Sequence, residues 1–183
     1  MSSSIKKPLL ILDLDETLIH AVGMPLECRH DFRVGHYYVY KRPHVDSFLA
    51  TVSTAFQLAV WSSSTPDYVA TVVTQLFKDD GQLQFCWGRD RCTPRYHPEW
   101  QSSYWIKDLK KVKRAGYDLD RVLIVDDTPR KLERNYGNAV YVRPFAGDQD
   151  DEELQYLAPY LLSLAAFPNM RRIEKRNWGL RSL

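Results

Sequence analysis

Two carboxylates separated by one residue follow an apolar run near the start of the chain. Residues 9–12 are Leu-Leu-Ile-Leu, and Asp13-Leu14-Asp15 comes directly after them. Residues i and i+2 of a strand share a face, so both carboxylates can reach one pocket. Like charges this close need compensation, which a divalent cation supplies. A nucleophilic carboxylate beside a proton-transferring one is suited to phosphoryl transfer through an aspartyl-phosphate; the plainer alternative is a strand end followed by an acidic helix N-cap.

The apolar pattern of the chain predicts the elements that must position these carboxylates. Four buried strands are predicted, at 8–13, 56–61, 122–125 and 139–142. Helices are predicted after Pro43, after Thr65, at 106–115, at 128–137 and at 152–167, the last interrupted near Pro159. Apolar strands without alternation, separated by helices, favour an α/β fold with a doubly wound, mainly parallel sheet and helices on both faces. A β-flap within 20–41 and a small insert within 82–105 are expected in place of a large cap domain.

Polar side chains follow three of the predicted strands. Asp13 and Asp15 follow the first, Ser62 the second, and Asp126 and Asp127 the third. In an open parallel sheet these strand ends face one crevice, so we expect the side chains to meet. Each also has an ordinary explanation: Ser62 can satisfy a strand end, and the two later aspartates can cap the following helix.

Five segments occur in an order typical of a known family: 13–18, 41–49, 61–64, 104–109 and 125–129. With these segments the chain resembles phosphatases of the haloacid dehalogenase (HAD) superfamily. It is most similar to RNA polymerase II carboxy-terminal-domain phosphatases and NLI-interacting-factor-like proteins. The resemblance runs from about Leu9 to Leu164, which is most of the chain.

The resemblance implies a role for each matching side chain. Asp13 would attack phosphorus, and Asp15 would protonate the leaving alkoxide and then deprotonate the hydrolytic water. Ser62 and Lys107 would bind the phosphate. Many relatives have Thr in place of Ser62, a change that keeps the hydroxyl. Taken alone, Lys107 could equally belong to the solvated face of a helix.

The resemblance also implies a Mg²⁺ site and a substrate contact. Asp13, the backbone carbonyl of Asp15, Asp126 and Asp127 would hold the metal, although relatives often have Asn in place of Asp127. Arg89 stands where relatives carry an arginine near the substrate groove; a structural Arg–Asp pair is the competing interpretation. An insert longer and more aromatic than in the relatives, at 93–103, leaves their peptide specificity in doubt here.

The composition of the chain indicates the class of protein and the cellular compartment in which it is expected. The chain has 183 residues, 44% of them apolar and 26% charged, with a net charge of +2, which is typical of a globular domain and disfavours nucleic acid as a partner. We expect one domain at 1–167 and a basic, solvated or frayed tail at 168–183. Three cysteines without a Cys-x-x-Cys pair indicate a reducing compartment, cytoplasmic or nuclear. The first apolar run is too short for a signal sequence or membrane span.

The function predicted from these residues is a Mg²⁺-dependent phosphatase acting on phosphorylated protein segments. A groove for such a segment could be lined by Phe32, Tyr37, Trp87 and Trp100. Two alternatives stay open: a phosphatase for a small molecule or a nucleic-acid end, and a catalytically idle module that binds phosphoproteins. The sequence does not indicate an oligomeric state.

Overall fold

A parallel sheet forms the centre of the molecule. The computed structural model describes residues 6–77, 81, 83–99 and 101–180. Within them the central sheet has five strands in the order β10-β9-β1-β5-β6, and every neighbouring pair is parallel. The strands are β1 (Leu9–Leu12), β5 (Gln57–Trp61), β6 (Cys86–Trp87), β9 (Val122–Asp126) and β10 (Ala139–Tyr141). The four predicted strands are present, and β6 extends the sheet beyond β5.

Strand β1 explains why the apolar pattern lacks alternation. Leu10 and Leu12 belong to one hydrophobic cluster, whereas Leu9 and Ile11 belong to a second. All four are at most 2% exposed, so both faces of the strand are buried. A strand that is covered on both faces has no position where a polar side chain could reach water.

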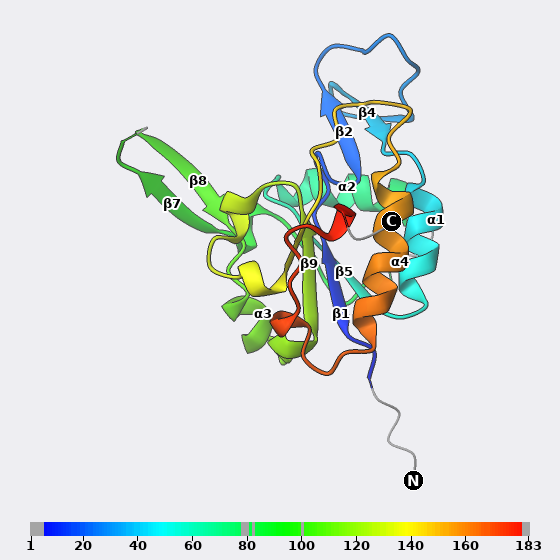
Figure 1. Ribbon diagram of the computed structural model, residues 1–183. Helices are drawn as coiled ribbons and strands as arrows, with labels where there is room; N and C mark the ends of the chain where they lie inside the picture. The colour runs from blue at the N-terminus through cyan, green and yellow to red at the C-terminus, as the bar shows by residue number, and fades with distance from the viewer. Residues whose placement is uncertain (1–5, 78–80, 82, 100, 181–183) are drawn as a thin grey trace.

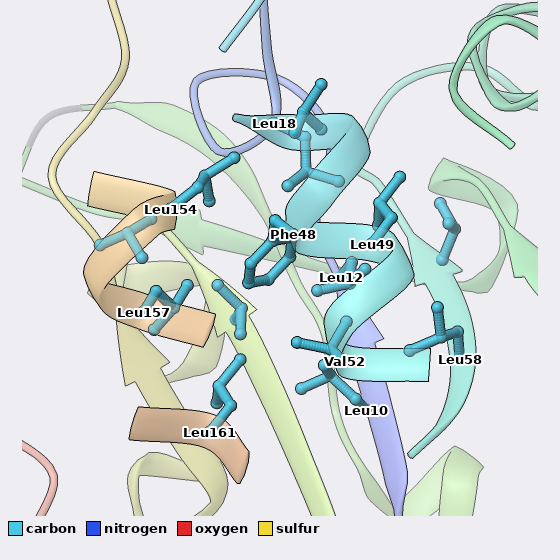
Figure 2. Close-up of a cluster of buried hydrophobic side chains, with 14 of the residues drawn as sticks. Leu10, Leu12, Leu18, Phe48, Leu49, Val52, Leu58, Leu154, Leu157 and Leu161 are labelled. Atoms are coloured by element: carbon cyan, nitrogen blue, oxygen red, sulfur yellow. The ribbon is translucent and has the colours of Figure 1, made fainter. Parts of the chain in front are cut away.

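Three helices cover one face of the sheet: α1 (Val45–Ser53), α2 (Pro66–Leu76) and α4 (Glu153–Ala165). Figure 2 shows Phe48 of α1 in one cluster with Leu12 of β1 and Leu157 of α4. The apolar spacing of α1 therefore turns its buried face to the sheet. Among the described residues, no helix has the length and apolar character that a membrane crossing requires.

The opposite face is covered by the short helix α3 (Lys110–Arg114) and irregular segments. Leu109, Val112 and Leu132 pack there with Ile11 of β1. Helices and segments on both faces of a parallel sheet confirm the predicted doubly wound α/β fold.

Two small antiparallel sheets extend from this core (Figure 1). The flap consists of β2 (Ile19–Val22), β3 (Phe32–Val34) and β4 (Tyr37–Lys41) in the order β2-β4-β3, as expected within 20–41. The second is a hairpin of β7 (Thr93–His97) and β8 (Ser102–Ile106).

The helix predicted at 106–115 is wrong in its first half. Ile106 ends strand β8 and pairs with Thr93, and the helix begins only at Lys110. The aromatic and β-branched residues before it favour the pleated surface of a strand over a helix. The end of the helix is as predicted, because Gly116 has a φ of 95°.

The helix predicted at 128–137 is also wrong. The segment forms two 3₁₀ turns, η4 (Pro129–Leu132) and η5 (Tyr136–Asn138). The carbonyl oxygen of Lys131 accepts a 2.8 Å hydrogen bond from the backbone N–H of Lys107, a tertiary bond that competes with continuation of a helix.

Helix α4 is not interrupted at Pro159, contrary to the prediction. Pro159 lies inside the helix on its exposed side. Leu157 and Leu161 are fully buried on either side of it, and their packing holds the helix together where one backbone hydrogen bond is missing.

The expectation of a frayed tail is wrong for residues 170–178, although Arg171, Arg172 and Arg176 are exposed, as in a solvated tail. Met170 and Trp178 belong to the same cluster as helix α4, and the Trp178 indole donates a 2.6 Å hydrogen bond to the carbonyl of Tyr141. Lys175 is 5% exposed and donates to two backbone carbonyls. An apolar residue at each end of the segment ties its basic residues to the domain.

The flap and the C-terminal half are joined by a buried ion pair, which gives a stability prediction. Arg42 is 0% exposed and makes two 2.8 Å hydrogen bonds to Asp151. Arg42→Ala should lower the free energy of unfolding by about 3 kcal/mol, because it leaves Asp151 without its partner. Lys41→Ala, which removes the ion pair with the exposed Asp46, should cost less than about 1 kcal/mol. Urea denaturation of both variants checks this contrast, and equal losses would contradict it.

Candidate active site

The strand order reverses at β1, and the candidate site lies at this reversal. From β1 the chain builds β5 and β6 on one side, and then β9 and β10 on the other. Asp13 directly follows β1 and Asp126 ends the neighbouring β9. The carboxyl ends of parallel strands at such a point form the binding crevice of open α/β sheets.

Three of the predicted metal ligands come together. Asp13 and Asp126 are buried, Asp127 is partly buried, and one ligand atom from each lies within 4.8 Å of the others. Carboxylate oxygens are the hard ligands that Mg²⁺ prefers, and Mg²⁺ needs only a few of them because it keeps several waters. This donor set therefore fits the predicted ion. Asp126 also accepts a hydrogen bond from the Thr128 N–H. The alternative that the two aspartates cap a helix is wrong, because the segment after them forms a 3₁₀ turn whose N-cap residue is Thr128.

Lys107 lies against this cluster and not on a solvated helix. It follows strand β8 and is 0% exposed. Its Nζ is 2.9 Å from Asp13 Oδ1 and 2.6 Å from Asp126 Oδ2. The buried ammonium thus neutralises part of the charge that the two carboxylates bring together.

A second lysine, which the sequence analysis missed, lies in the same cluster. Lys131 Nζ is 2.9 Å from Asp13 Oδ2, 3.4 Å from Asp127 Oδ1 and 3.6 Å from Asp126 Oδ1. Burial favours the neutral amine, but the three carboxylates outweigh it and raise the pKa of Lys131. The only sequence signal was its position four residues after Asp127.

The pKa values of the two buried carboxyls are shifted in opposite directions. Burial alone would raise the pKa of Asp13, but Lys107 and Lys131 outweigh it and lower that pKa to about 2. Burial and the charge of Asp13 raise the pKa of Asp126 to about 7. Asp13 is thereby kept as an ionised carboxylate, the form that can act as a nucleophile.

Asp15 faces a different group of partners. Its carboxylate accepts hydrogen bonds from Tyr68 Oη at 2.6 Å and from Ser64 Oγ at 2.8 Å, with Ser62 Oγ at 3.4 Å. The next residue, Glu16, has a φ of 58°, an uncommon left-handed conformation that turns the chain sharply after Asp15. Asp13 and Asp15 therefore face different partners within one crevice.

Ser62 lies where the sequence placed it, at the end of β5. It is 1% exposed, and its hydroxyl accepts a 3.0 Å hydrogen bond from the backbone N–H of Ser64. The hydroxyl is also close to Asp15, so it can turn toward a phosphate oxygen bound between the two aspartates. The contacts of Ser64 and Tyr68 with Asp15 were missed by the sequence analysis. Ser64 belongs to the segment 61–64 but was given no role, and Tyr68, in the first turn of α2, lies in none of the five segments.

Arg89 lines a pocket that opens beside Asp15. The pocket has a volume of about 320 Å³, and Tyr37, Ser64 and Tyr68 contribute to its walls. The Nε of Arg89 donates a 2.7 Å hydrogen bond to the carbonyl of Ser63. Arg89 therefore lies beside Asp15 and is held by a backbone carbonyl; its contact with substrate stays a prediction.

The predicted aromatic groove is found only in part. Tyr37 lines the pocket beside Asp15. Phe32 packs against the core under α2, and Trp87 packs on Phe85 and Trp61 at the edge of the sheet. Trp100 lies outside the described residues.

Comparison with known proteins shows the family to which the chain belongs. Residues 8–171 match the model of the NLI interacting factor-like phosphatase family. The chain is 34% identical to the CTD nuclear envelope phosphatase 1 homolog of Drosophila melanogaster, over 99% of this chain and 77% of that protein. It is 33% identical to CTD nuclear envelope phosphatase 1 of Xenopus laevis, over 96% of this chain and 74% of that protein.

Solved structures show the same fold. The beryllium fluoride-bound structure of the fission yeast RNA polymerase II CTD phosphatase Fcp1 aligns with 87% of this chain, with a TM-score of 0.58 and 19% identity. This chain spans about half the length of the Fcp1 chains that it matches, covering 50% and 49% of two such structures.

Proposed function

Because this chain belongs to the NLI interacting factor-like phosphatase family, we propose that it hydrolyses phosphomonoesters on protein side chains, with Mg²⁺ and through an aspartyl-phosphate on Asp13. The observation that carries the proposal is the ionised, buried Asp13, held by two lysines at a three-carboxylate cluster. A nucleophile and a neutralised phosphate-binding crevice are the two requirements of this chemistry.

The first half of the proposed reaction uses both aspartates. An Asp13 oxygen attacks phosphorus, and the bond between phosphorus and the ester oxygen breaks. Protonated Asp15 gives its proton to the leaving alkoxide, so that a neutral alcohol departs. Asp15 is suited to proton transfer because it lies two residues from Asp13 and has hydroxyl partners, whereas Asp13 is paired with two lysines.

The second half reverses the role of Asp15. The carboxylate takes a proton from a water molecule whose oxygen attacks the phosphorus of the aspartyl-phosphate. The bond between phosphorus and Asp13 breaks, which releases inorganic phosphate and restores Asp13. Ser62 and Lys107 would hold the phosphate oxygens during both steps.

The acidic cluster supports the proposed cofactor. Asp13, Asp126, Asp127 and the carbonyl of Asp15 would hold Mg²⁺. When bound, the ion would offset the negative charge that phosphate and carboxylates bring into one crevice. The hard oxygen ligands of the three carboxylates suit such a divalent ion.

The surroundings of Asp15 support the proposed substrate class. The flap and the β7–β8 hairpin extend to different sides of the sheet edge (Figure 1), and the pocket beside Asp15 is open. Tyr37 and Arg89 give this pocket one aromatic and one cationic wall. A phosphorylated side chain on an extended protein segment fits such a site, and the relatives from Drosophila and Xenopus are named as CTD nuclear envelope phosphatases.

A hydrogen bond to Asp15 gives a test of its positioning. Burial and the charge of Asp15 raise the pKa of Tyr68, so its phenol stays a hydrogen-bond donor at neutral pH. Tyr68→Phe removes this bond and should lower kcat roughly tenfold, because hydrogen bonds to charged groups contribute about 1.5 kcal/mol or more. Steady-state kinetics and thermal unfolding of the variant check this. An unchanged kcat in a folded variant would show that Tyr68 does not position Asp15.

Substrate competition tests the proposed substrate class. We expect kcat/KM for phosphoserine or phosphothreonine peptides to exceed that for sugar phosphates and nucleoside monophosphates, all measured with Mg²⁺ and with chelator. A preference for the small phosphates would favour the small-molecule alternative. Tight phosphopeptide binding without turnover would favour the binding module.

A further inference from the structure

The ammonium of Lys131 contacts all three carboxylates of the acidic cluster. It contacts one oxygen from each of the three carboxylates proposed to hold Mg²⁺: Asp13 Oδ2, Asp127 Oδ1 and Asp126 Oδ1, at 2.9, 3.4 and 3.6 Å. An ion bound by the same three side chains would need oxygens at about 2.0–2.1 Å. Two cations cannot share this small space without strong repulsion.

Lys107 uses the opposite oxygens of the same carboxylates. It contacts Asp13 Oδ1 and Asp126 Oδ2, whereas Lys131 contacts Asp13 Oδ2 and Asp126 Oδ1. Lys107 can therefore keep both of its contacts while Mg²⁺ replaces the Lys131 ammonium at Asp13 Oδ2 and Asp126 Oδ1. Of the two lysines, only Lys131 contacts all three carboxylates that would hold the metal ion.

Lys131 is also built so that its side chain can leave while its backbone stays. Its N–H donates to the carbonyl of Thr128 at 3.0 Å, and its carbonyl accepts from the N–H of Lys107 at 2.8 Å. The Lys131 side chain is 19% exposed, whereas that of Lys107 is 0% exposed. A flexible four-carbon stem at the mouth of the crevice gives the ammonium a route to water.

We propose that Lys131 is a built-in competitor of the divalent cation: it holds the three carboxylates together in the metal-free protein and is displaced when Mg²⁺ binds. This inference rests on the proposed function, because it assigns the metal to Asp13, Asp126 and Asp127. The consequence is a metal affinity reduced by the fraction of time that the ammonium occupies the site.

Titration calorimetry with Mg²⁺ tests this competition without measuring activity. Lys131→Met should bind Mg²⁺ about tenfold more tightly than the unchanged protein, as expected if the ammonium occupies the site about nine-tenths of the time. Lys131→Arg, which keeps the positive charge, should stay weak. Lys110→Met, a change at an exposed lysine, should leave the affinity unchanged. The metal-free Lys131→Met protein should unfold at a lower temperature and gain more from added Mg²⁺ than the unchanged protein.

A measurement on the unchanged protein covers the case in which the variant does not fold. Mg²⁺ should increase the rate at which an amine-acetylating reagent modifies Lys131, read by peptide mass spectrometry, and leave Lys110 unaffected. An equal or weaker Mg²⁺ affinity of folded Lys131→Met, or an acetylation rate of Lys131 that Mg²⁺ does not raise, would overturn the competition while leaving the metal site intact. No Mg²⁺ binding by either protein would remove the metal site itself, and with it both proposals.

Discussion

Asp13→Asn is expected to abolish Mg²⁺-dependent hydrolysis of an aryl phosphate, lowering kcat by roughly 10⁴-fold or more. The amide keeps the shape of the side chain but cannot attack phosphorus, and it removes the charge that faces Lys107 and Lys131. Steady-state kinetics with Mg²⁺ and with chelator measure the loss.

The experiment must distinguish a loss of activity caused by misfolding from one caused by loss of the nucleophile. Asp46→Asn, a change at an exposed aspartate outside the crevice, is the matched control and should keep full activity. Circular dichroism and thermal unfolding should show that Asp13→Asn still folds, since Lys107 keeps its contact with Asp126. Substantial turnover by folded Asp13→Asn would assign the nucleophile to another group.

Asp15→Asn should lower kcat by about 10²–10⁴-fold, in a way that depends on the leaving group. A nitrophenolate leaves without a proton, so the first step should suffer less than the attack of water on the aspartyl-phosphate. The variant should therefore release a burst of nitrophenol and then turn over slowly. With a phosphoserine peptide, whose alkoxide needs the proton, both steps should be slow and no burst should appear.

Rapid-mixing kinetics with both substrates check the behaviour of Asp15→Asn. Tyr68 and Ser64 donate to different oxygens of Asp15, Oδ1 and Oδ2. In Asp15→Asn the amide oxygen can still accept from the Tyr68 phenol, and the Ser64 hydroxyl can accept from the amide N–H, so the side chain should keep its place. Equal losses for the two substrates, without a burst, would show that Asp15 does not transfer the proton. Asp67→Asn, at the first turn of α2, provides a control for changes in local charge.

The position of the site could be predicted because the carboxyl ends of parallel strands form the binding crevice of an open α/β sheet. Asp13 and Asp126 follow apolar runs that can only be buried strands, and adjacent parallel strands bring such residues to one edge. Ser62 follows by the same argument. The side-chain roles came from the resemblance to a family, and the roles themselves stay predictions.

What the sequence did not show depends on contacts between distant segments. Lys131 enters the cluster because the chain forms a 3₁₀ turn at 129–132, and that turn is fixed by a backbone bond to Lys107. Ser64 and Tyr68 approach Asp15 only after α2 packs beside β5. The tail is attached through a few buried side chains, among them Trp178, whose indole reaches the carbonyl of Tyr141. No local periodicity encodes contacts of this kind.

Chemical trapping of the intermediate tests the central claim most directly. Protein quenched during turnover is reduced with borohydride, which converts an aspartyl-phosphate to homoserine, and the product is located by tandem mass spectrometry. The account predicts homoserine at position 13, formed only when both phosphorylated substrate and Mg²⁺ are present, and in larger amount with Asp15→Asn and an aryl phosphate. Homoserine at another position, or none at position 13 under the burst conditions of Asp15→Asn, would contradict it.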